Sequence, residues 1–260
     1  KAIYAVPMQG VPLLDELMAN AWRPAVLETH AGWRYRWTDG VTRRANSALA
    51  LGTNGSVGEL VARAEAFYGK RGAPTLIQVS TASAPPSLAT YLKARGYQST
   101  ARTLVEEVAT RDVVGRTWPS AYEIEITEAP TDEWFDTYWS VEASRGHSDA
   151  DLVVCRDVLL APGLPTAFIA ARRGSEVVGT GQLVTERGWG GVQCMATHPS
   201  HRRRGVAKAV LRGLAEEALR REVANMYLAV IADNDAATAL YQRSGFKVGH
   251  EYSYFADRID

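Results

Sequence analysis

The chain has 260 residues, of which 46% are hydrophobic and 22% are charged, ordinary values for a folded globular protein. They exclude a disordered, a collagen-like and a cysteine-stapled chain, and the length allows one large domain or two small ones. Lys and Arg together number 29, and so do Asp and Glu. With no net charge there is no overall field to attract nucleic acid or an anionic membrane, so any anion site must be local.

The cysteines and the apolar runs restrict the environment of the protein. Cys155 and Cys194 are too few for a disulfide framework, and neither has a metal-ligand partner at close spacing. No apolar run reaches the roughly 20 residues that span a bilayer, and no signal peptide is visible. We therefore expect a cytoplasmic protein that binds no metal, no membrane and no nucleic acid.

The first half of the chain predicts two helices and two strands after a polar cluster. Arg43, Arg44, Asn46 and Ser47 form this cluster on a strand-like segment, and we expect it at a solvated edge rather than facing a substrate. The elements that follow are a helix over Val57–Tyr68, a strand over Thr75–Val79, a helix over Pro86–Arg95 and a strand over Tyr97–Val108.

A polar segment with Gly115 and Pro119 then interrupts the pattern. It is the best domain boundary in the chain. We predict a first lobe over residues 1–110, a linker over 111–121 and a second lobe over 122–260.

The second half alternates strands and helices in a fuller series. In chain order we expect a strand over Tyr122–Thr127, helices over Thr131–Ala143 and Asp149–Leu160, strands over Pro165–Arg172, Glu176–Val184 and Trp189–Thr197, a helix from Val206 to about Arg221, a strand over Asn225–Ile231, a helix over Asp235–Ser244 and a strand over Lys247–Phe255. This order of elements indicates an α/β fold.

The first half repeats the end of this series at an offset of 149 residues. Gly96 falls on Gly245 (245 − 96 = 149), and the same offset places Val57 on Val206. The helix, strand, helix and strand stay in register. A period of this length indicates two copies of one fold, because solenoid repeats are about 20–50 residues long.

A motif suited to phosphate lies between a strand and a helix of the second half. Residues 202–207 read RRRGVA, and the helix begins within them. Free N–H groups at a helix start attract anions, Gly205 lets a phosphate approach the backbone, and arginines add charge and donors. The alternatives are a solvated charge cluster and a nucleic-acid patch. The preceding strand, the glycine and the following helix favour phosphate.

Together with two neighbouring segments, this loop resembles the GCN5-related N-acetyltransferase (GNAT) family. Arg202, Gly205 and Ala207 occupy the fixed positions of the family signature R/Q-x-x-G-x-G/A. Residues 195–199 (MATHP) resemble the segment before the loop, and residues 234–246 resemble the closing motif N-x-x-A-x-x-L-Y-x-x-x-G-F. The resemblance implies two GNAT-like lobes, each a mixed twisted sheet with flanking helices, with the complete acyl-CoA fold in the second.

The resemblance implies acetyl-CoA as the acetyl donor. Two central parallel strands would diverge in a V, with the pantetheine arm between them against Met195, Ala196 and Thr197. Asn234 would contact the cofactor near the sulfur or at this arm. Tyr241 would lie beside the sulfur and protonate the departing thiolate, as a hydroxyl with a pKa near 10 can. The pyrophosphate would lie on the loop of Arg202, Arg203, Arg204, Gly205, Val206, Ala207 and Lys208.

The other polar residues of the second half carry weaker expectations. Tyr241 alone would be a half-buried helix residue, and the motif around it favours the catalytic role. We expect Cys194 to be inert and His198 to be structural. No general base is assigned, because the strand before the loop has no carboxylate. The loose candidates are Glu142, His147, Asp149 and Glu186.

The first lobe lacks this chemistry. At the offset of 149, Leu92 replaces Tyr241, Pro85 replaces Asn234, and Thr53–Ser56 replaces the loop without an arginine. We therefore expect a structural or acceptor-shaping first lobe. The predicted activity is direct transfer of an acetyl group to a primary amine of a small molecule, with a protein amine left open. The alternative is a non-catalytic acyl-CoA sensor or scaffold.

Overall fold

The computed structural model describes residues 11–52, 55–83, 85–116, 121–144, 146–161 and 163–258. The first half contains α1 (Val11–Ala21), β1 (Val26–His30), β2 (Trp33–Trp37), β3 (Ala48–Ala50), α2 (Val57–Gly69), β4 (Leu76–Ser80), α3 (Leu88–Ala94) and β5 (Gln98–Ala109). The short helix α4 (Thr110–Val114) follows, inside the predicted linker except for its first residue. No helix in these ranges is long and apolar enough to cross a membrane.

The second half follows the predicted series. It contains β6 (Glu123–Thr127), α5 (Asp132–Ala143), α6 (Asp149–Leu160), β7 (Thr166–Arg173), β8 (Glu176–Glu186), β9 (Trp189–Thr197), the 3₁₀ turn η1 (Pro199–His201), α7 (Val206–Arg220), β10 (Asn225–Ile231), α8 (Asp235–Arg243) and β11 (Lys247–Ala256). Each predicted element is present, within two residues of its expected ends. The sequence analysis did not foresee α1 and β1–β3.

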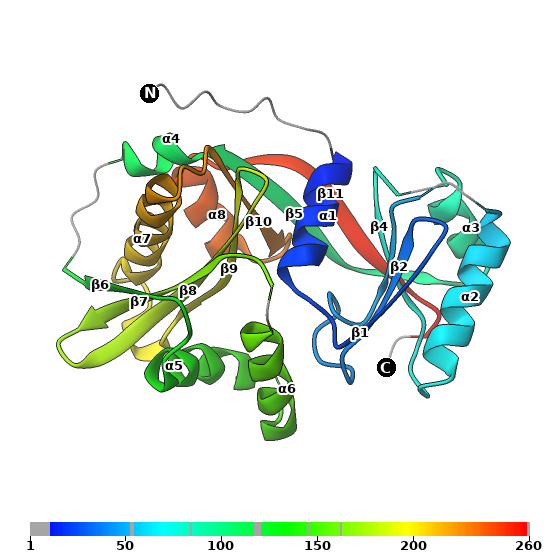
Figure 1. Ribbon diagram of the computed structural model, residues 1–260, viewed down its shortest axis with the longest axis horizontal. Coiled ribbons are helices and arrows are strands. Elements are labelled where there is room, and N and C mark those ends of the chain that lie inside the picture. Colours follow the sequence, from blue (N-terminus) through cyan, green and yellow to red (C-terminus); the bar gives the residue numbers. More distant parts are fainter. Residues whose placement is uncertain are drawn as a thin grey trace.

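The strands form one mixed sheet, in which each half receives its last strand from the other half. The order is β1-β2-β3-β4-β11-β5-β10-β9-β8-β7-β6. β11 pairs with β4 of the first half, and β5 pairs with β10 of the second half. β5 and β11 pair with each other in antiparallel fashion and cross the middle of the molecule (Figure 1).

The predicted repeat is confirmed by the positions of the elements. α2 begins at Val57 and α7 at Val206, an offset of 149 (206 − 57 = 149). Across the central strand pair, Thr103 lies opposite Tyr252, which is its own counterpart at this offset (252 − 103 = 149). A residue can face its counterpart in an antiparallel pair only at a two-fold axis. An approximate two-fold axis therefore passes through this pair.

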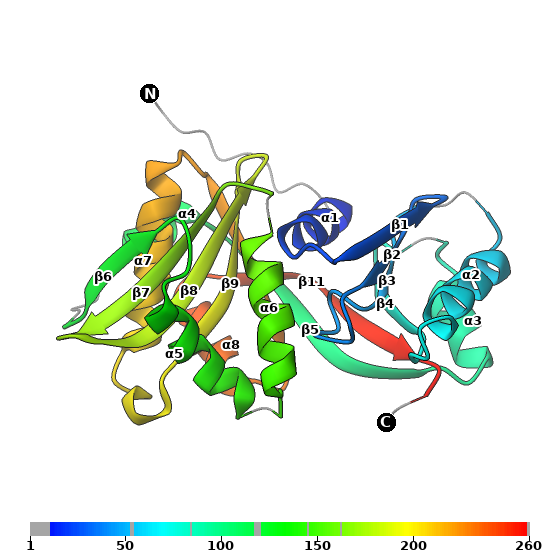
Figure 2. The ribbon, with the colours of Figure 1, turned by 60° about the horizontal axis from the view of Figure 1, so that its bottom comes forward.

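Helices cover both faces of the sheet. α5 and α6 lie in front of β7–β9 and α7 lies behind them, while α2 and α3 cover the first half (Figure 2). The exchanged strands contribute to both cores: Phe255 of β11 is buried in the core of the first half, and Val108 of β5 is buried in that of the second. Burying such a side chain contributes roughly 1.5–3 kcal/mol, so each half stabilises the other.

α1 lies between the two halves and is anchored to the sheet by a buried polar group (Figure 1). Asp15 of α1 is 1% exposed, and one of its carboxylate oxygens lies 3.0 Å from Nε2 of His250 in β11. The other oxygen accepts a hydrogen bond of 2.5 Å from the hydroxyl of Ser80 at the end of β4. The helix therefore contacts strands that belong to both halves of the sequence.

The expected solvated edge is correct for Arg43, which is exposed, and wrong for most of the polar cluster of residues 43–47. The segment is a turn before β3, and Asn46 and Ser47 are buried rather than solvated. The side-chain oxygen of Asn46 accepts a hydrogen bond of 2.8 Å from the Thr38 N–H, and the Ser47 hydroxyl lies 2.8 Å from the buried guanidinium of Arg36. These side chains point inward because they satisfy backbone groups and a buried cation.

One buried carboxyl generates a pH-dependent prediction. Glu106 of β5 is 0% exposed, and neither carboxylate oxygen has a hydrogen-bond partner among the described residues. Burial raises the pKa of Glu106. Because the raised pKa belongs to the folded state, ionising this group costs stability as the pH rises above the usual carboxyl range.

We expect Glu106→Gln to raise the melting temperature at pH 8, because it removes the buried charge. The difference from the unmodified protein should shrink toward pH 4, near the usual carboxyl pKa, where Glu106 is neutral in the folded protein. Thermal unfolding followed by circular dichroism between pH 4 and pH 8 measures this. The exposed Glu123 of β6 provides the control Glu123→Gln. A gain that does not depend on pH would contradict the partnerless buried carboxyl.

Candidate active site

The two parallel strands of the second half separate and leave a wedge between them. β9 and β10 pair up to Val192 and Leu228. β9 then continues to Thr197 and β10 to Ile231, with no pairing between these ends in the described residues. The V-shaped divergence implied by the sequence resemblance is therefore confirmed.

An extra residue in β9 accompanies the divergence. Thr180 and Gln182 are two residues apart on β8, but their partners on β9 are three residues apart. Cys194 lies in this bulge with φ of 51°. A bulge bends its strand and increases the local twist. Residues 195–197 run from this bulge to the end of the strand, and their backbone groups on the side away from β8 face the wedge.

Two glycines of β8 bring α7 directly onto the sheet at the end of the wedge. A Cβ at Gly181 would lie 2.7 Å from Cγ1 of Val210, and one at Gly179 would overlap Val206. Gly179 is also the partner of Thr197 at the end of β9. The first turn of α7 therefore lies beside the end of the strand that lines the wedge. The sequence analysis missed these glycines, although a glycine inside a strand can signal close approach of another element.

The start of α7 presents backbone N–H groups. Its first hydrogen bond runs from the Ala209 N–H to the Gly205 carbonyl at 3.1 Å, so the amides of Val206, Ala207 and Lys208 precede it. Gly205 has φ of 85°, and nothing lies within 4 Å of the position of a Cβ there. This is a helix start with room for an anion against the backbone.

The three arginines of the loop surround this start. The side chains of Arg202, Arg203 and Arg204 are exposed, and Arg203 has φ of 63°. The Tyr122 hydroxyl donates a hydrogen bond of 3.1 Å to the Arg204 carbonyl and so connects the loop to the start of the second half. Exposed guanidinium groups beside a helix start suit a pyrophosphate in their charge and in their donors.

Asn234 is the N-cap of α8. Its side-chain oxygen accepts a hydrogen bond of 3.2 Å from the Ala237 N–H. The cap uses the oxygen, and the NH₂ group of the amide is the donor that a ligand would contact. The predicted contact with the cofactor stays a prediction.

Tyr241 lies in the buried cluster beneath α7 and α8. It is 7% exposed, and its ring lies 5.9 Å from that of Phe246. The same cluster includes Val230 from the diverging part of β10, and Met195 from the other side of the wedge packs against it. This burial is compatible with both a core role and a hydroxyl at the base of the wedge, so the catalytic role of Tyr241 stays a prediction.

Two of the four candidates for the general base, Glu186 and Asp149, lie in ordinary surface environments or hold other side chains. Glu186 accepts a hydrogen bond of 3.0 Å from the Asn20 amide and lies 3.3 Å from the guanidinium of Arg187. Asp149 is exposed in the first turn of α6. Neither carboxylate lies in an environment that marks it as a proton acceptor.

The other two candidates, Glu142 and His147, lie beside each other. Glu142 is 3.7 Å from His147, counted between the carboxylate oxygen and the ring nitrogen. Burial, with smaller contributions from Cys155 and then Glu142, raises the pKa of the Cys194 thiol far above its usual range. A thiol with such a pKa stays protonated at neutral pH, which supports the inert role expected for Cys194.

In the first half, α2 corresponds to α7, and its first turn carries a carboxylate in place of a cation. The Ser56 hydroxyl accepts from the Glu59 N–H at 3.3 Å, and the Glu59 carboxylate accepts from the Ser56 N–H at 3.2 Å. Glu59 corresponds to Lys208 (208 − 59 = 149). The hydrogen bonds from Ser56 lower the pKa of Glu59, so the start of α2 holds a carboxylate that repels phosphate. Leu92 is fully buried, and Thr53 and Asn54 lie outside the described residues.

A mixed sheet with diverging parallel strands, and a glycine loop and helix start at their open end, defines a GNAT protein, and the repeat makes it a tandem one. A GCN5-related N-acetyltransferase from Kribbella flavida has this fold with a TM-score of 0.72, at 14% identity over 97% of both chains. A tandem GNAT protein from the clavulanic acid biosynthesis pathway gives a TM-score of 0.67, at 14% identity over 95% of this chain and 88% of its own.

The chain belongs to the family described as "Probable histone acetyltransferase Rv0428c C-terminal", whose profile matches residues 11–255. It is also 27% identical over 252 residues to the "Uncharacterized N-acetyltransferase YobR" of Bacillus subtilis (strain 168). The match covers 95% of this chain and 98% of that relative. The protein is therefore an acetyltransferase of the GNAT type, as the sequence motifs predict.

The loop before α7 generates a prediction for cofactor binding. Gly205→Val introduces a β-branched residue at positive φ and fills the space above the helix start, so the affinity for acetyl-CoA should fall at least tenfold. Arg202→Ala should cost about 1–3 kcal/mol of binding if the guanidinium donates to a phosphate. Calorimetry with acetyl-CoA measures both effects, and the unmodified protein should bind one molecule per chain.

The controls separate backbone strain and charge from binding. Gly96 has φ of 84° with nothing within 4 Å of a Cβ, so Gly96→Val imposes the same strain, about 1–2 kcal/mol, far from the loop. Arg111→Ala removes an exposed arginine of α4. Both should leave the affinity for acetyl-CoA unchanged. Equal losses in the loop variants and their controls would exclude the loop as the phosphate site.

Proposed function

We propose that the protein transfers the acetyl group of acetyl-CoA directly to a primary amine of a small molecule. The observation that carries this proposal is the position of the wedge, which ends at the start of α7. An extended thioester arm between β9 and β10 would bring its pyrophosphate to the loop before α7. The backbone groups of residues 195–197, the open space at Gly205 and the loop arginines fit these two parts of the molecule.

The reaction needs three contributions from the chain. A backbone N–H of residues 195–197 polarises the thioester carbonyl. The neutral amine attacks the carbonyl carbon, so that a C–N bond forms and the C–S bond breaks. The Tyr241 hydroxyl donates its proton to the departing sulfur, and the proton lost by the amine passes through solvent to restore the hydroxyl. No residue of the chain becomes covalently acetylated.

Two arguments favour a small acceptor, and a third favours a reducing cytoplasm. The chain has no net negative charge to attract a lysine-rich protein tail. The tandem GNAT protein with a similar fold belongs, by its description, to the biosynthesis of a small molecule. Both cysteines are free thiols, which suits a reducing compartment. The family description names histones, so a protein amine is the alternative acceptor.

A turnover assay tests the proposal against a non-catalytic acyl-CoA sensor. Purified protein is mixed with acetyl-CoA and a panel of small amines, polyamines and lysine peptides, and the free thiol of CoA is measured. We expect thiol release with at least one small amine. Release with peptides only would assign a protein acceptor. Tight binding of acetyl-CoA without release for any amine would favour the sensor.

Tyr241→Phe tests the proposed proton donor, because it keeps the buried ring and removes only the hydroxyl. The affinity for acetyl-CoA should change little, and kcat should fall by roughly 10²–10⁴-fold. Tyr91→Phe in α3, the corresponding helix of the first lobe, is the control and should leave kcat unchanged. A normal kcat with a lower melting temperature would instead assign Tyr241 to the core.

A further inference from the structure

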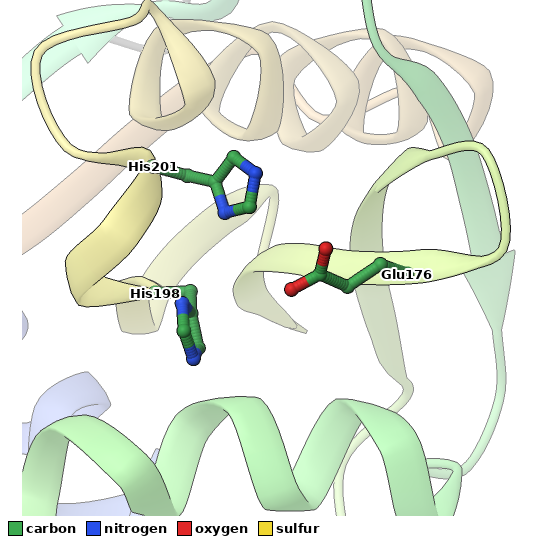
Figure 3. Close-up of side chains that lie close together, drawn as sticks. All are labelled: Glu176, His198 and His201. Carbon is green, nitrogen blue, oxygen red and sulfur yellow. The ribbon is translucent and has the colours of Figure 1, made fainter.

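Three side chains that the proposed reaction does not use lie together just before the phosphate loop. They are Glu176, His198 and His201, and each offers a ligand atom within 4.8 Å of the others. Figure 3 shows the carboxylate and the two imidazole rings around one space, with Glu176 on a strand and the histidines on a neighbouring turn. Carboxylate and imidazole are donors that bind divalent transition metals in proteins.

The backbone around these residues is held by hydrogen bonds. The His198 N–H donates to the Val178 carbonyl at 3.0 Å, which joins it to β8 two residues beyond Glu176. The His201 N–H donates to the His198 carbonyl at 2.9 Å, which closes η1. The three residues are therefore neighbours because of strand pairing and a turn, although Glu176 is far from the histidines in the sequence.

Ser200 orients both rings. Its hydroxyl oxygen lies 2.7 Å from Nδ1 of His198 and 3.0 Å from Nδ1 of His201. The two Nδ1 atoms turn toward each other and toward Ser200, while the Nε2 atoms point apart (Figure 3), so a metal would bind the Nδ1 atoms and replace their hydrogen bonds to Ser200.

We propose that Glu176, His198 and His201 form a binding site for one Zn²⁺ ion, with the fourth position taken by water. Two ligands of a tetrahedral zinc ion are about 3.3 Å apart, given bonds of about 2.0–2.1 Å. The ligand atoms must therefore move inward, and Glu176 is free to do so because its side chain is exposed. His201 is buried and fixes one side of the site.

The charges and position of the site define its role. The carboxylate offsets one of the two positive charges of the ion, and the arginines that follow His201 are exposed, so solvent screens their repulsion. A bound ion would connect the start of β8 to the segment between β9 and the phosphate loop. It would therefore fix the position of the phosphate loop. The three ligand residues of the metal site do not depend on which acyl donor the protein uses.

Zinc titration of the untagged, chelator-treated protein tests the site directly. Calorimetry should give one Zn²⁺ per chain, and Zn²⁺ should raise the melting temperature. Co²⁺ serves as a spectroscopic probe, because a site with imidazole and carboxylate ligands gives visible absorption bands that free Co²⁺ in water does not show. Neither measurement requires acetyl-CoA or turnover, so the outcome is independent of the proposed function.

Matched variants assign the ion to these residues. Glu176→Gln and His198→Gln should each weaken Zn²⁺ binding at least tenfold and remove the thermal shift. Glu123→Gln and His30→Gln change exposed residues elsewhere and should bind as the unmodified protein does. Melting curves without metal identify any variant that fails to fold. The absence of stoichiometric zinc binding, or unchanged binding in Glu176→Gln and His198→Gln, would overturn the proposal.

Discussion

The pairing of β10 with β5 is the constraint on which the site depends. β10 diverges from β9 after Leu228, yet its last three residues remain hydrogen-bonded, because they pair with Thr103–Val105 of β5. An unpaired strand edge inside a sheet would cost the free energy of several hydrogen bonds. The first half of the chain supplies β5, which hydrogen-bonds to β10 on one side of the wedge, and β8 hydrogen-bonds to β9 on the other. The first lobe therefore helps to hold the wedge open.

The two helix starts differ in how well they suit an anion. Both α2 and α7 begin after a glycine-containing loop, and the backbone of each exposes N–H groups there. In the first lobe the capping box of Ser56 and Glu59 satisfies two N–H groups and places a carboxylate at the helix start. In the second lobe the N-cap is Gly205, which has no side chain, and Lys208 stands where the carboxylate would be. The local electrostatic field thus has opposite sign at equivalent positions of one fold.

Periodicity and motifs predicted most of the second half, because its elements carry strong local signals. β9 has the predicted bounds, and Thr131 caps α5 as a helix start with a threonine at this position should. β1 was not predicted, because all its residues are exposed and it shows no alternation of apolar and polar residues. Its partner β2 was missed as well. The apolar residues of α1, among them Leu14, Leu17 and Met18, do have helical spacing, so this helix could have been predicted.

Long-range features were beyond local sequence patterns. The exchange of β5 and β11 depends on which strand edges meet, and periodicity along one strand carries no information about its neighbours. The bulge at Cys194 and the neighbourhood of Glu176 and His198 likewise follow from strand register. The repeat, by contrast, was visible in the sequence. The offset of 149 relates α2, β4, α3 and β5 to α7, β10, α8 and β11, and Val57 and Val206 begin equivalent helices.

The two-fold axis through Thr103 and Tyr252 has a consequence for the origin of the chain. With the connection between the halves removed, the arrangement is that of a homodimer in which two identical subunits exchange their last strands, a low-cost route to dimers. In such a dimer every substitution occurs twice. In one polypeptide the two copies can differ, and here Leu92 and Glu59 stand at the positions that Tyr241 and Lys208 occupy in the second copy.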